Sequence, residues 1–456
     1  MRKYRLRVSG KHYNALRSHL FPGDGLEAVA FLLCGRRNGK DGTTYLVHEV
    51  VCVPYEVCDR RRDSVTWKTD SMSAILDRAD LDGLSVFKVH SHTSSFETFS
   101  STDDYSDNEM FRVLDSWGEK VLEGGSLIML PDGRMFGRVT NWTPISEISV
   151  AGNALSFWRD DNEDVDCKPE FAANEQVFGS GTTRSLSKLR IAVVGCSGTG
   201  SVVIEQLARL GVANLVLVDH DRIEARNLNR IINAKNSDLG RFKADVIKAA
   251  IESHNIGTKV EAITKNLFDP GVVERVAECD VVFGCMDTAE GRHLLNRVAT
   301  FYLLPYFDLG VHLAADGTGG ITEASGVVHY IEPGRSSLFS RGAYGLEQVK
   351  AEGLKRTNPA EYEERKKINY IEGVDEQAPA VISVNTTVAG IAVNEFLSRL
   401  HSFRSCDGDD CSIVRFSFME TLIIKESEGG ACDTLERHVG RGDIEPMLGL
   451  SSLIKR

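Results

Sequence analysis

Short apolar runs separated by polar turns recur through the first part of the chain, up to about Pro144. Compact apolar runs favour buried strands, whereas apolar positions three and four apart favour an amphipathic helix. On this basis we expect strands at 28–33, 45–53, 85–90, 126–130 and 134–139, and helices near 12–20 and 103–117. The mixture predicts an α+β domain over residues 1–150.

The next stretch is acidic and polar, since residues 158–176 read WRDDNEDVDCKPEFAANEQ. This composition is typical of a linker or an exposed arm. We therefore predict a linker or arm over 151–184 and a second domain that begins at 185.

The pattern changes from Lys188 onward. The apolar strand LRIAVVG is followed by a glycine-containing loop, an amphipathic helix (SVVIEQLARLGV) and a second apolar strand, NLVLVDHD. This order is typical of a βαβ unit in a parallel sheet, so residues 185–456 are predicted to form an α/β Rossmann-like domain. We expect further strands at 260–263, 280–284 and 305–309, helices near 243–254 and 291–300, an irregular polar segment at 332–378, and a long helix at 381–400.

Composition narrows the class of protein. Of 456 residues, 42% are hydrophobic and 26% charged, as in globular proteins, and no apolar run approaches the ~20 residues that span a bilayer. The net charge of −12 disfavours nucleic acid as a partner, because phosphate binding needs a basic surface. The start, MRKYRLRVSGKHYNAL, lacks the apolar core of a secretory signal, so we expect a cytoplasmic protein without a membrane anchor.

Two histidines and an acid are spaced as metal ligands in the first domain. His90 and His92 are two apart on a predicted strand, so both imidazoles leave the same face. Ser100 and Asp103 lie three apart at a predicted helix start, where a capping box is the alternative interpretation. His-x-His followed after seven residues by Ser-x-x-Asp resembles the signature of the JAB/MPN (JAMM) metallopeptidases.

This resemblance assigns roles to five residues. It implies that His90, His92 and Asp103 hold Zn²⁺, that Glu27 is the general base, and that Ser100 donates a hydrogen bond to the oxyanion. Thr93 is a departure, because the family often has proline there. Family members cut bonds after the C-terminal glycine of ubiquitin-like proteins.

A phosphate-binding loop is predicted in the second domain. Gly195, Gly198 and Gly200 lie between a strand and a helix, where backbone N–H groups receive phosphates. Their spacing departs from the dehydrogenase fingerprint G-x-G-x-x-G, and an NAD-linked oxidoreductase is the alternative up to this point. The cations that follow, Arg230 and Lys243, favour attack on a phosphorus atom, where negative charge develops, over hydride transfer.

The second set resembles the ThiF/MoeB/E1 family of ATP-dependent adenylating enzymes. The resemblance implies that the glycines line the phosphates, that Asp219 binds the ribose, and that Asp287 holds Mg²⁺. It further implies phosphate contacts for the remaining polar and basic positions, namely Asn227, Arg230 and Lys243. Such enzymes are usually homodimers and activate a protein carboxylate as an acyl-adenylate.

Many of these enzymes then form a thioester. Ser337 and Ser340 stand where the family often has cysteines, and a serine is a poor acceptor without a strong base. Ten cysteines are present without any CxxC pair, which argues against a four-cysteine zinc ribbon. Cys432 is our first candidate acceptor because we expect it to be exposed, followed by Cys411 and Cys406.

Together the two sites predict a bacterial-type enzyme that activates and processes a ubiquitin-like protein, with an E2-like protein as a further partner and an antiphage role by analogy. One alternative is a degenerate JAB module that only docks partners beside an active adenylating domain. Another is an enzyme that adenylates a sulfur-carrier protein, or a peptide, small molecule or modified tRNA.

Overall fold

The computed structural model describes residues 2–68, 70–118, 122–159, 168–367 and 380–453, and it divides the chain into two compact units. Unit 1 comprises residues 1–163, 300–303 and 437–449, and unit 2 comprises residues 164–299, 304–436 and 450–456. Each has its own eight-stranded sheet. Among the described residues, no helix combines the length and hydropathy that a membrane crossing requires.

Unit 1 is built on a mixed sheet with the strand order β10-β9-β1-β3-β2-β6-β7-β8. The strands and helices are β1 (Lys3–Ser9), α1 (Gly10–Leu20), β2 (Val29–Asn38), β3 (Gly42–Cys52), β4 (Cys58–Arg60), β5 (Val65–Trp67), α2 (Asp70–Asp82), β6 (Ser85–Ser91), α3 (Ser101–Ser116), β7 (Gly124–Met129), β8 (Met135–Val139), β9 (Glu147–Ala151) and β10 (Leu155–Arg159). The predicted α+β class is therefore confirmed.

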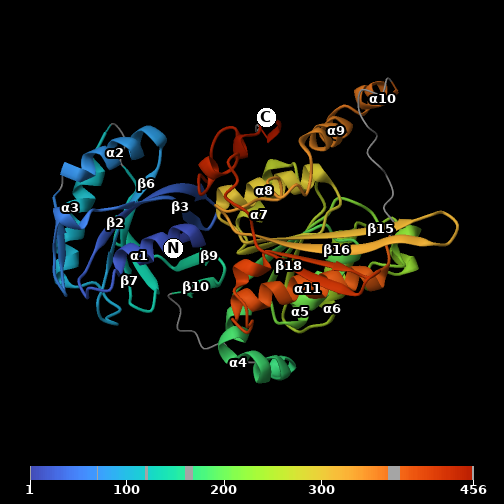
Figure 1. Ribbon diagram of the computed structural model, residues 1–456, viewed down its shortest axis with the longest axis horizontal. Coiled ribbons are helices and arrows are strands. Elements are labelled where there is room, and N and C mark those ends of the chain that lie inside the picture. Colours follow the sequence, from blue (N-terminus) through green and yellow to red (C-terminus); the bar gives the residue numbers. More distant parts are fainter. Residues whose placement is uncertain (1, 69, 119–121, 160–167, 368–379, 454–456) are drawn as a thin grey trace. The chain divides into compact units, whose positions relative to one another are not determined.

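Both faces of this sheet are buried, as the alternation along β2 shows. Ala30, Leu32 and Cys34 pack with α1, whereas Phe31 and Leu33 pack on the opposite face with α2 and α3. Because successive strand residues point to opposite faces, an uninterrupted apolar strand needs cover on both sides. Figure 1 shows α1 on one side of the sheet and α2 and α3 on the other.

Unit 2 contains a sheet in the order β13-β12-β11-β14-β15-β16-β17-β18, parallel from β13 to β15 and antiparallel beyond. Its elements are α4 (Ala172–Leu186), β11 (Arg190–Val194), α5 (Gly198–Arg209), β12 (Asn214–Val218), α6 (Lys243–Ser253), β13 (Lys259–Ile263), α7 (Pro270–Ala277), β14 (Val281–Gly284), α8 (Ala289–Tyr302), β15 (Tyr306–Ala315), β16 (Ile321–Ile331), α9 (Leu346–Thr357), α10 (Pro359–Lys367), α11 (Ile382–Leu400), β17 (Ile413–Ser417) and β18 (Leu422–Glu426). Helices α5, α6 and α11 cover one face, and α7 and α8 cover the other (Figure 1).

This topology has one switch point. The chain moves outward from β11 through β12 to β13, then returns through α7 to β14 on the other side of β11. In open α/β sheets, ligands bind at the carboxyl ends of the strands where the order reverses. The ends of β11 and β14 therefore mark the expected ligand crevice of unit 2.

Three expectations about elements and boundaries need correction. The predicted linker at 151–184 contains β10 and most of α4, and only residues 160–167 of it lie outside the described part. The predicted irregular segment at 332–378 contains α9 and α10, with residues 368–378 outside the described part. Residues 437–449, expected in the second domain, belong to unit 1.

Candidate functional sites

The end of β6 and the start of α3 bring the three predicted metal ligands of unit 1 together. Nε2 of His90 is 3.0 Å from Oδ1 of Asp103, and Nε2 of His92 is 3.6 Å from Oδ2 of the same carboxylate. One donor atom from each of the three residues lies within 4.8 Å of the others. Two imidazole nitrogens and a carboxylate oxygen form a donor set suited to zinc, with a fourth position left for water.

The histidines are held in place by buried surroundings. His90 is 4% exposed, and its Nε2 is a buried atom without a well-aligned hydrogen bond. Nδ1 of His92 contacts the carbonyl of Phe96 at 3.0 Å, so the ring's second nitrogen fixes its orientation. Burial lowers the pKa of His90, which favours the neutral form that binds a metal. These residues fit a zinc ion.

Asp103 is both the third ligand and a helix-capping residue. Ser100 caps α3: its hydroxyl accepts a hydrogen bond from the Asp103 N–H, while Oδ2 of Asp103 accepts from the Ser100 N–H. The Ser100 hydroxyl also donates to that same Oδ2 at 2.7 Å. The capping box is thus present, and it places the carboxylate against the histidines. In this arrangement the Ser100 hydroxyl is committed to Asp103 and must turn to reach an oxyanion.

Glu27 lies two residues before the start of β2, opposite the end of β6. The neighbouring Ala28 N–H donates to the Ser91 hydroxyl, which ties the two strands together at this level. Arg60 donates to the Glu27 carbonyl at 2.8 Å and fixes the backbone. Burial raises the pKa of the Glu27 carboxyl to about 7, with His92 acting in the opposite direction. A carboxyl that titrates near neutrality suits a general acid–base role.

A buried ion-pair network behind the histidines was missed in the sequence. Nζ of Lys88 is 2.5 Å from Oδ1 of Asp107, and the two side chains are 2% and 0% exposed. Arg138 donates to Oδ2 of Asp107 at 2.6 Å and to Asp104 at 2.7 Å. The network ties α3, and hence Asp103, to β6 and β8. A lysine inside the otherwise apolar strand SVFKVH was the available signal.

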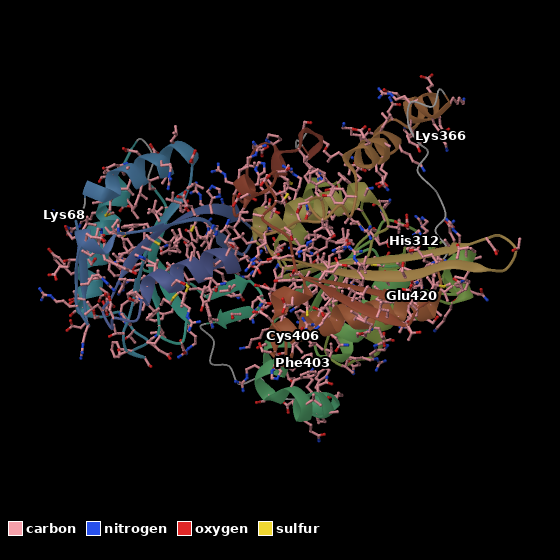
Figure 2. All side chains as sticks on the ribbon, in the orientation of Figure 1. Lys68, His312, Lys366, Phe403, Cys406 and Glu420 are labelled. Carbon is pink, nitrogen blue, oxygen red and sulfur yellow. The ribbon has the colours of Figure 1, made fainter. Side chains whose placement is uncertain are left out.

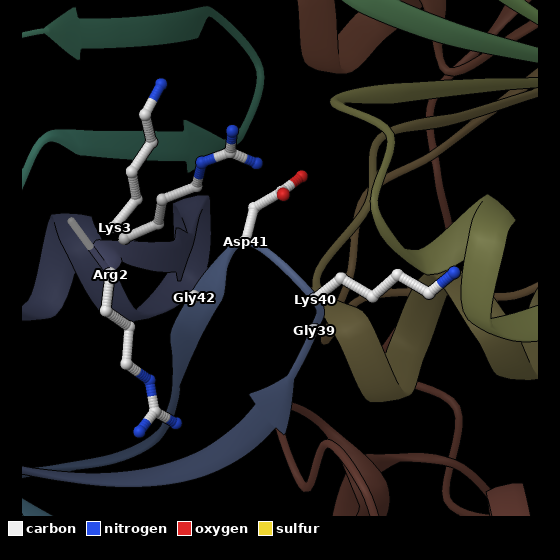
Figure 3. Close-up of a pocket in the computed structure, with 7 residues that line it drawn as sticks. Arg2, Lys3, Gly39, Lys40, Asp41 and Gly42 are labelled. Carbon is white, nitrogen blue, oxygen red and sulfur yellow. The ribbon is translucent and has the colours of Figure 1, made fainter.

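A separate hollow is lined by unit 1 residues. It measures about 780 Å³ and is lined by Arg2, Lys3, Arg5, Gly39, Lys40, Asp41 and Gly42 (Figure 3). Val29 pairs with His90, whereas this hollow lies past Asn38 at the other end of β2. Ten strand residues span roughly 30 Å, so the hollow is distinct from the histidine site.

In unit 2, the glycine loop lies at the switch point of the sheet. Gly195 follows β11 with a φ of 94°, a backbone conformation that residues with a side chain rarely adopt. A Cβ on Gly200 would lie 1.8 Å from the Gly195 carbonyl oxygen. The first turn of α5 can therefore pack against the loop only if residue 200 is glycine. The first turn of α5 presents free N–H groups here, as phosphate binding requires.

Asp219 supports this loop. Its Oδ2 accepts from the Cys196 N–H at 2.7 Å, and its Oδ1 accepts from the Asp221 N–H at 2.9 Å. Burial raises the pKa of Asp219, and Lys243 opposes that shift. The carboxylate predicted to bind a ribose thus already holds two backbone turns.

The predicted cations reach the same crevice. Nζ of Lys243, at the start of α6, donates to Oδ2 of Asp221 at 2.7 Å. Arg230 donates to the Arg226 carbonyl at 2.7 Å, and its Cδ lies 3.4 Å from a Cβ built on Gly198. Asn227, 4% exposed, accepts from the Glu224 N–H and holds the turn that leads to Arg230. The exposed Asp287 follows the end of β14 at the same edge of the sheet.

Asn385 of α11 was missed by sequence reasoning. It is 3% exposed, and its Nδ2 would lie 2.1 Å from a Cβ on Gly198. The amide therefore packs directly against the start of α5. An asparagine inside an apolar helix was the available signal, because a buried amide needs polar partners.

Comparison with known proteins assigns both units. A model described as "ThiF family" matches residues 171–418, more than half of the chain. The chain belongs to the ThiF family. A second model, "Prokaryotic homologs of the JAB domain", matches residues 9–143, so unit 1 carries a JAB domain and unit 2 the ThiF domain.

Curated relatives match part of the ThiF domain. A "Ubiquitin-like modifier-activating enzyme 5" of Aedes aegypti is 31% identical over 163 residues, which is 33% of this chain and 38% of that protein. A "SAMP-activating enzyme E1" of Haloferax volcanii is 37% identical over 131 residues, 29% of this chain and 48% of that protein. The chain thus spans less than half the length of either relative.

Among solved structures, that of E. coli MccB with AMPCPP and MccA is similar to this chain. The two share 19% sequence identity and a TM-score of 0.47, and the match covers 60% of this chain and 76% of the MccB chain.

One expectation about the acceptor positions of the ThiF domain needs correction. Cys432 is 3% exposed, so the exposure on which its ranking depended was wrong. Ser337 and Ser340 bond one another: the Ser337 N–H donates to the Ser340 hydroxyl, and the Ser340 N–H donates to the Ser337 hydroxyl. Both serines close a tight turn.

Proposed function

We propose that the chain is a two-site enzyme. Its ThiF domain would use ATP to adenylate the C-terminal carboxylate of a ubiquitin-like protein, and its JAB domain would be a zinc-dependent peptidase acting on ubiquitin-like precursors or conjugates. The observation that carries the proposal is the convergence of the α5 N-terminus, Arg230 and Lys243 at the switch point. The names of the two curated relatives, both activating enzymes, support the substrate class.

In the adenylation step, a carboxylate oxygen attacks the α-phosphorus of ATP and the bond to pyrophosphate breaks. N–H groups at the start of α5 would bind phosphate oxygens, and the two cations would balance the negative charge that develops. Lys243 must exchange Asp221 for phosphate to do this. Asp287 would hold Mg²⁺, a role that needs one carboxylate beside the substrate phosphates.

In the JAB domain, His90, His92 and Asp103 would hold zinc, which when bound makes a water nucleophilic near neutral pH. Glu27, whose carboxyl has a pKa of about 7, would be the general base, the group that accepts a proton from an attacking water and returns it to the leaving amine.

ATP–pyrophosphate exchange tests the adenylating activity. We expect exchange that depends on a ubiquitin-like protein ending in glycine, and a fall of about 100-fold or more in Lys243→Met, because a charge-stabilising group is lost. Lys248→Met, on the same helix and partly exposed, is the matched control and keeps the wild-type rate. Equal rates in the two variants would contradict the proposed role of Lys243.

Zinc content and precursor cleavage test the JAB site. We expect about one zinc per purified chain, and its loss in His90→Ala, because the ligands hold the ion directly. Glu27→Gln should retain zinc and lose cleavage of the precursor by about 100-fold. Glu56→Gln, an exposed glutamate of the same unit, is the control. Bound zinc with no Glu27-dependent cleavage would instead indicate a docking module.

A further inference from the structure

Two cysteines and a lysine lie together at the far edge of the ThiF sheet. Sγ of Cys406 is 3.5 Å from Sγ of Cys411, and Nζ of Lys425 donates to Sγ of Cys406 at 3.2 Å. Cys406 is partly exposed, whereas Cys411 is 1% exposed. One thiol of the pair is thus accessible to solutes and the other is enclosed beside it.

The electrostatic surroundings distinguish the two thiols. Hydrogen bonding by Cys411, then by Lys425, lowers the pKa of Cys406, and Arg404 acts in the same direction. Burial raises the pKa of Cys411. A thiolate is the nucleophilic form, and neighbouring cations are what favour it. Cys406 therefore has the character of an attacking thiol and Cys411 that of a resolving thiol.

The segment around Cys411 is held by hydrogen bonds. Cys411 ends the 3-10 turn Gly408–Cys411, whose Gly408 and Cys411 carbonyls both accept hydrogen bonds from Arg399. The loop with Cys406 also carries Phe403, whose ring centroid is 6.4 Å from that of Phe178 in α4. Figure 2 marks Cys406 and Phe403 close together on this side of the domain. A bond between the sulfurs requires closure from 3.5 Å to about 2.05 Å, a small movement of the more exposed side chain.

The position of Cys406 argues against its use as a thioester acceptor. Lys425 is on β18, whereas the nucleotide crevice lies at β11 and β14. Four strand spacings separate β14 from β18, which amounts to roughly 19 Å at about 4.8 Å each. An acyl-adenylate in the crevice is therefore out of direct reach of this thiol.

We propose that Cys406 and Cys411 are a thiol–disulfide site, in which Cys406 attacks a small-molecule disulfide and Cys411 then closes an intramolecular bond. The Cys406 thiolate attacks one sulfur of the oxidant, the oxidant's S–S bond breaks, and one small thiol leaves. Cys411, losing its proton, attacks Sγ of Cys406 and releases the second thiol. The protein loses two protons and two electrons, and the small disulfide takes them up and is reduced to two thiols.

Competitive alkylation of the full-length protein tests the first step. In a short pulse of iodoacetamide at pH 7, peptide mapping should show Cys406 modified at least about tenfold faster than Cys52, because only the thiolate reacts. Cys52 is the internal control: it is exposed, and burial of its sulfur raises its pKa. Lys425→Met should reduce the difference and Lys248→Met should not. Equal rates at Cys406 and Cys52 would overturn the proposal.

Oxidised glutathione tests the second step. The expected product from the wild-type chain is a Cys406–Cys411 cross-linked peptide with a mass loss of about 2 Da, reversed by dithiothreitol. In Cys411→Ser we expect a stable mixed disulfide at Cys406. Absence of the cross-link in the wild-type chain, which needs no variant to fold, would refute the pairing. Neither assay uses ATP or a partner protein, so their outcome is independent of the proposed adenylation.

Discussion

Gly198 is required because a side chain of another helix occupies its space. A Cβ there would lie 2.1 Å from Nδ2 of Asn385. We expect Gly198→Ala to raise the KM for ATP by tenfold or more, and much less in an Asn385→Ala background, where the clash is relieved. The coupling energy should be about 0.5–3 kcal/mol, as found for residues in contact. Pyrophosphate exchange in the four proteins of the cycle measures it.

Gly200 provides the control for that cycle. A Cβ on Gly200 would lie 1.8 Å from the Gly195 carbonyl oxygen. Because this oxygen belongs to the backbone, no second side-chain substitution can relieve the clash. Gly200→Ala should therefore be equally impaired in the wild-type and Asn385→Ala backgrounds. Additive effects for both glycines would show that Asn385 does not limit the space at Gly198.

His329 should make stability depend on pH. It is 2% exposed, and burial, together with Arg341, Arg415 and Arg292, lowers its pKa from 6.5 to about 3. The unfolded chain takes up this proton near pH 6.5 and the folded chain only near pH 3, so stability is full above 6.5 and falls as the pH decreases below it. The loss approaches about 1.4 kcal/mol per pH unit for one proton.

Urea unfolding of His329→Gln between pH 7 and 4 measures this dependence. The variant should lose less stability on acidification than the wild type, because it lacks the titrating group. His312→Gln changes an exposed histidine on the paired strand β15 and should follow the wild-type slope. Parallel curves for all three proteins would contradict the role of His329.

At the scale of elements, α3 is anchored through one buried carboxylate. Asp107 has no exposed surface and forms ion pairs with Lys88 and Arg138. Asp107→Ala leaves an ammonium buried without its counter-charge, which typically costs about 3–5 kcal/mol. Asp104→Ala removes an acid of the same helix that pairs with the same arginine but is 53% exposed, and should cost less than about 1 kcal/mol. Chemical denaturation distinguishes the two; equal losses would contradict the anchoring role.

The elements that sequence predicted best are those with apolar periodicity. Strand β6 and helix α11 have nearly the predicted bounds, because the spacing of buried apolar residues along each of them matches a single secondary-structure period. Helices α9 and α10 were missed because few of their side chains are buried. Ala351 and Tyr362 are among those few, and they form no apolar stripe along the sequence.

The site residues could be predicted where their spacing in the sequence determines that their side chains lie close together. His90, His92 and Asp103 meet because strand and helix geometry fix their directions over a short span. Asn385 and Lys88 were not predicted, because their relation to the sites depends on packing between elements distant in sequence. The burial of Cys432 likewise depends on tertiary packing, which a glycine-rich and polar context does not reveal.

At the scale of the molecule, unit 1 is completed by a distant segment. Gly442 forms an isolated parallel β-bridge with Arg36 of β2, and the Asp443 N–H donates a hydrogen bond to the Arg36 carbonyl at 2.7 Å. His48 of β3 contacts the Val439 carbonyl at 2.6 Å through Nδ1. Residues 437–449 therefore extend the hydrogen bonding of a domain whose main part ends at residue 163.

Glycine substitution tests this attachment. Gly442 has a φ of 65°, and a Cβ would meet the Arg36 carbonyl at 2.2 Å, so Gly442→Ala should destabilise unit 1 by about 1–3 kcal/mol. Gly430→Ala, where a Cβ meets nothing within 4 Å, is the matched control. Hydrogen–deuterium exchange should show faster exchange in β2 and β3 for the first variant alone. Unchanged exchange there would show that the segment does not support these strands.

The same attachment has a consequence for synthesis. Roughly 270 residues separate the main part of unit 1 from the segment that completes it. A ribosome adding about 5–20 residues per second needs some 15–50 seconds to cover that interval. The domain that is translated first is thus completed only after most of unit 2 has been made. A chaperone that shields β2 and β3 during elongation would act on it before residue 437 emerges.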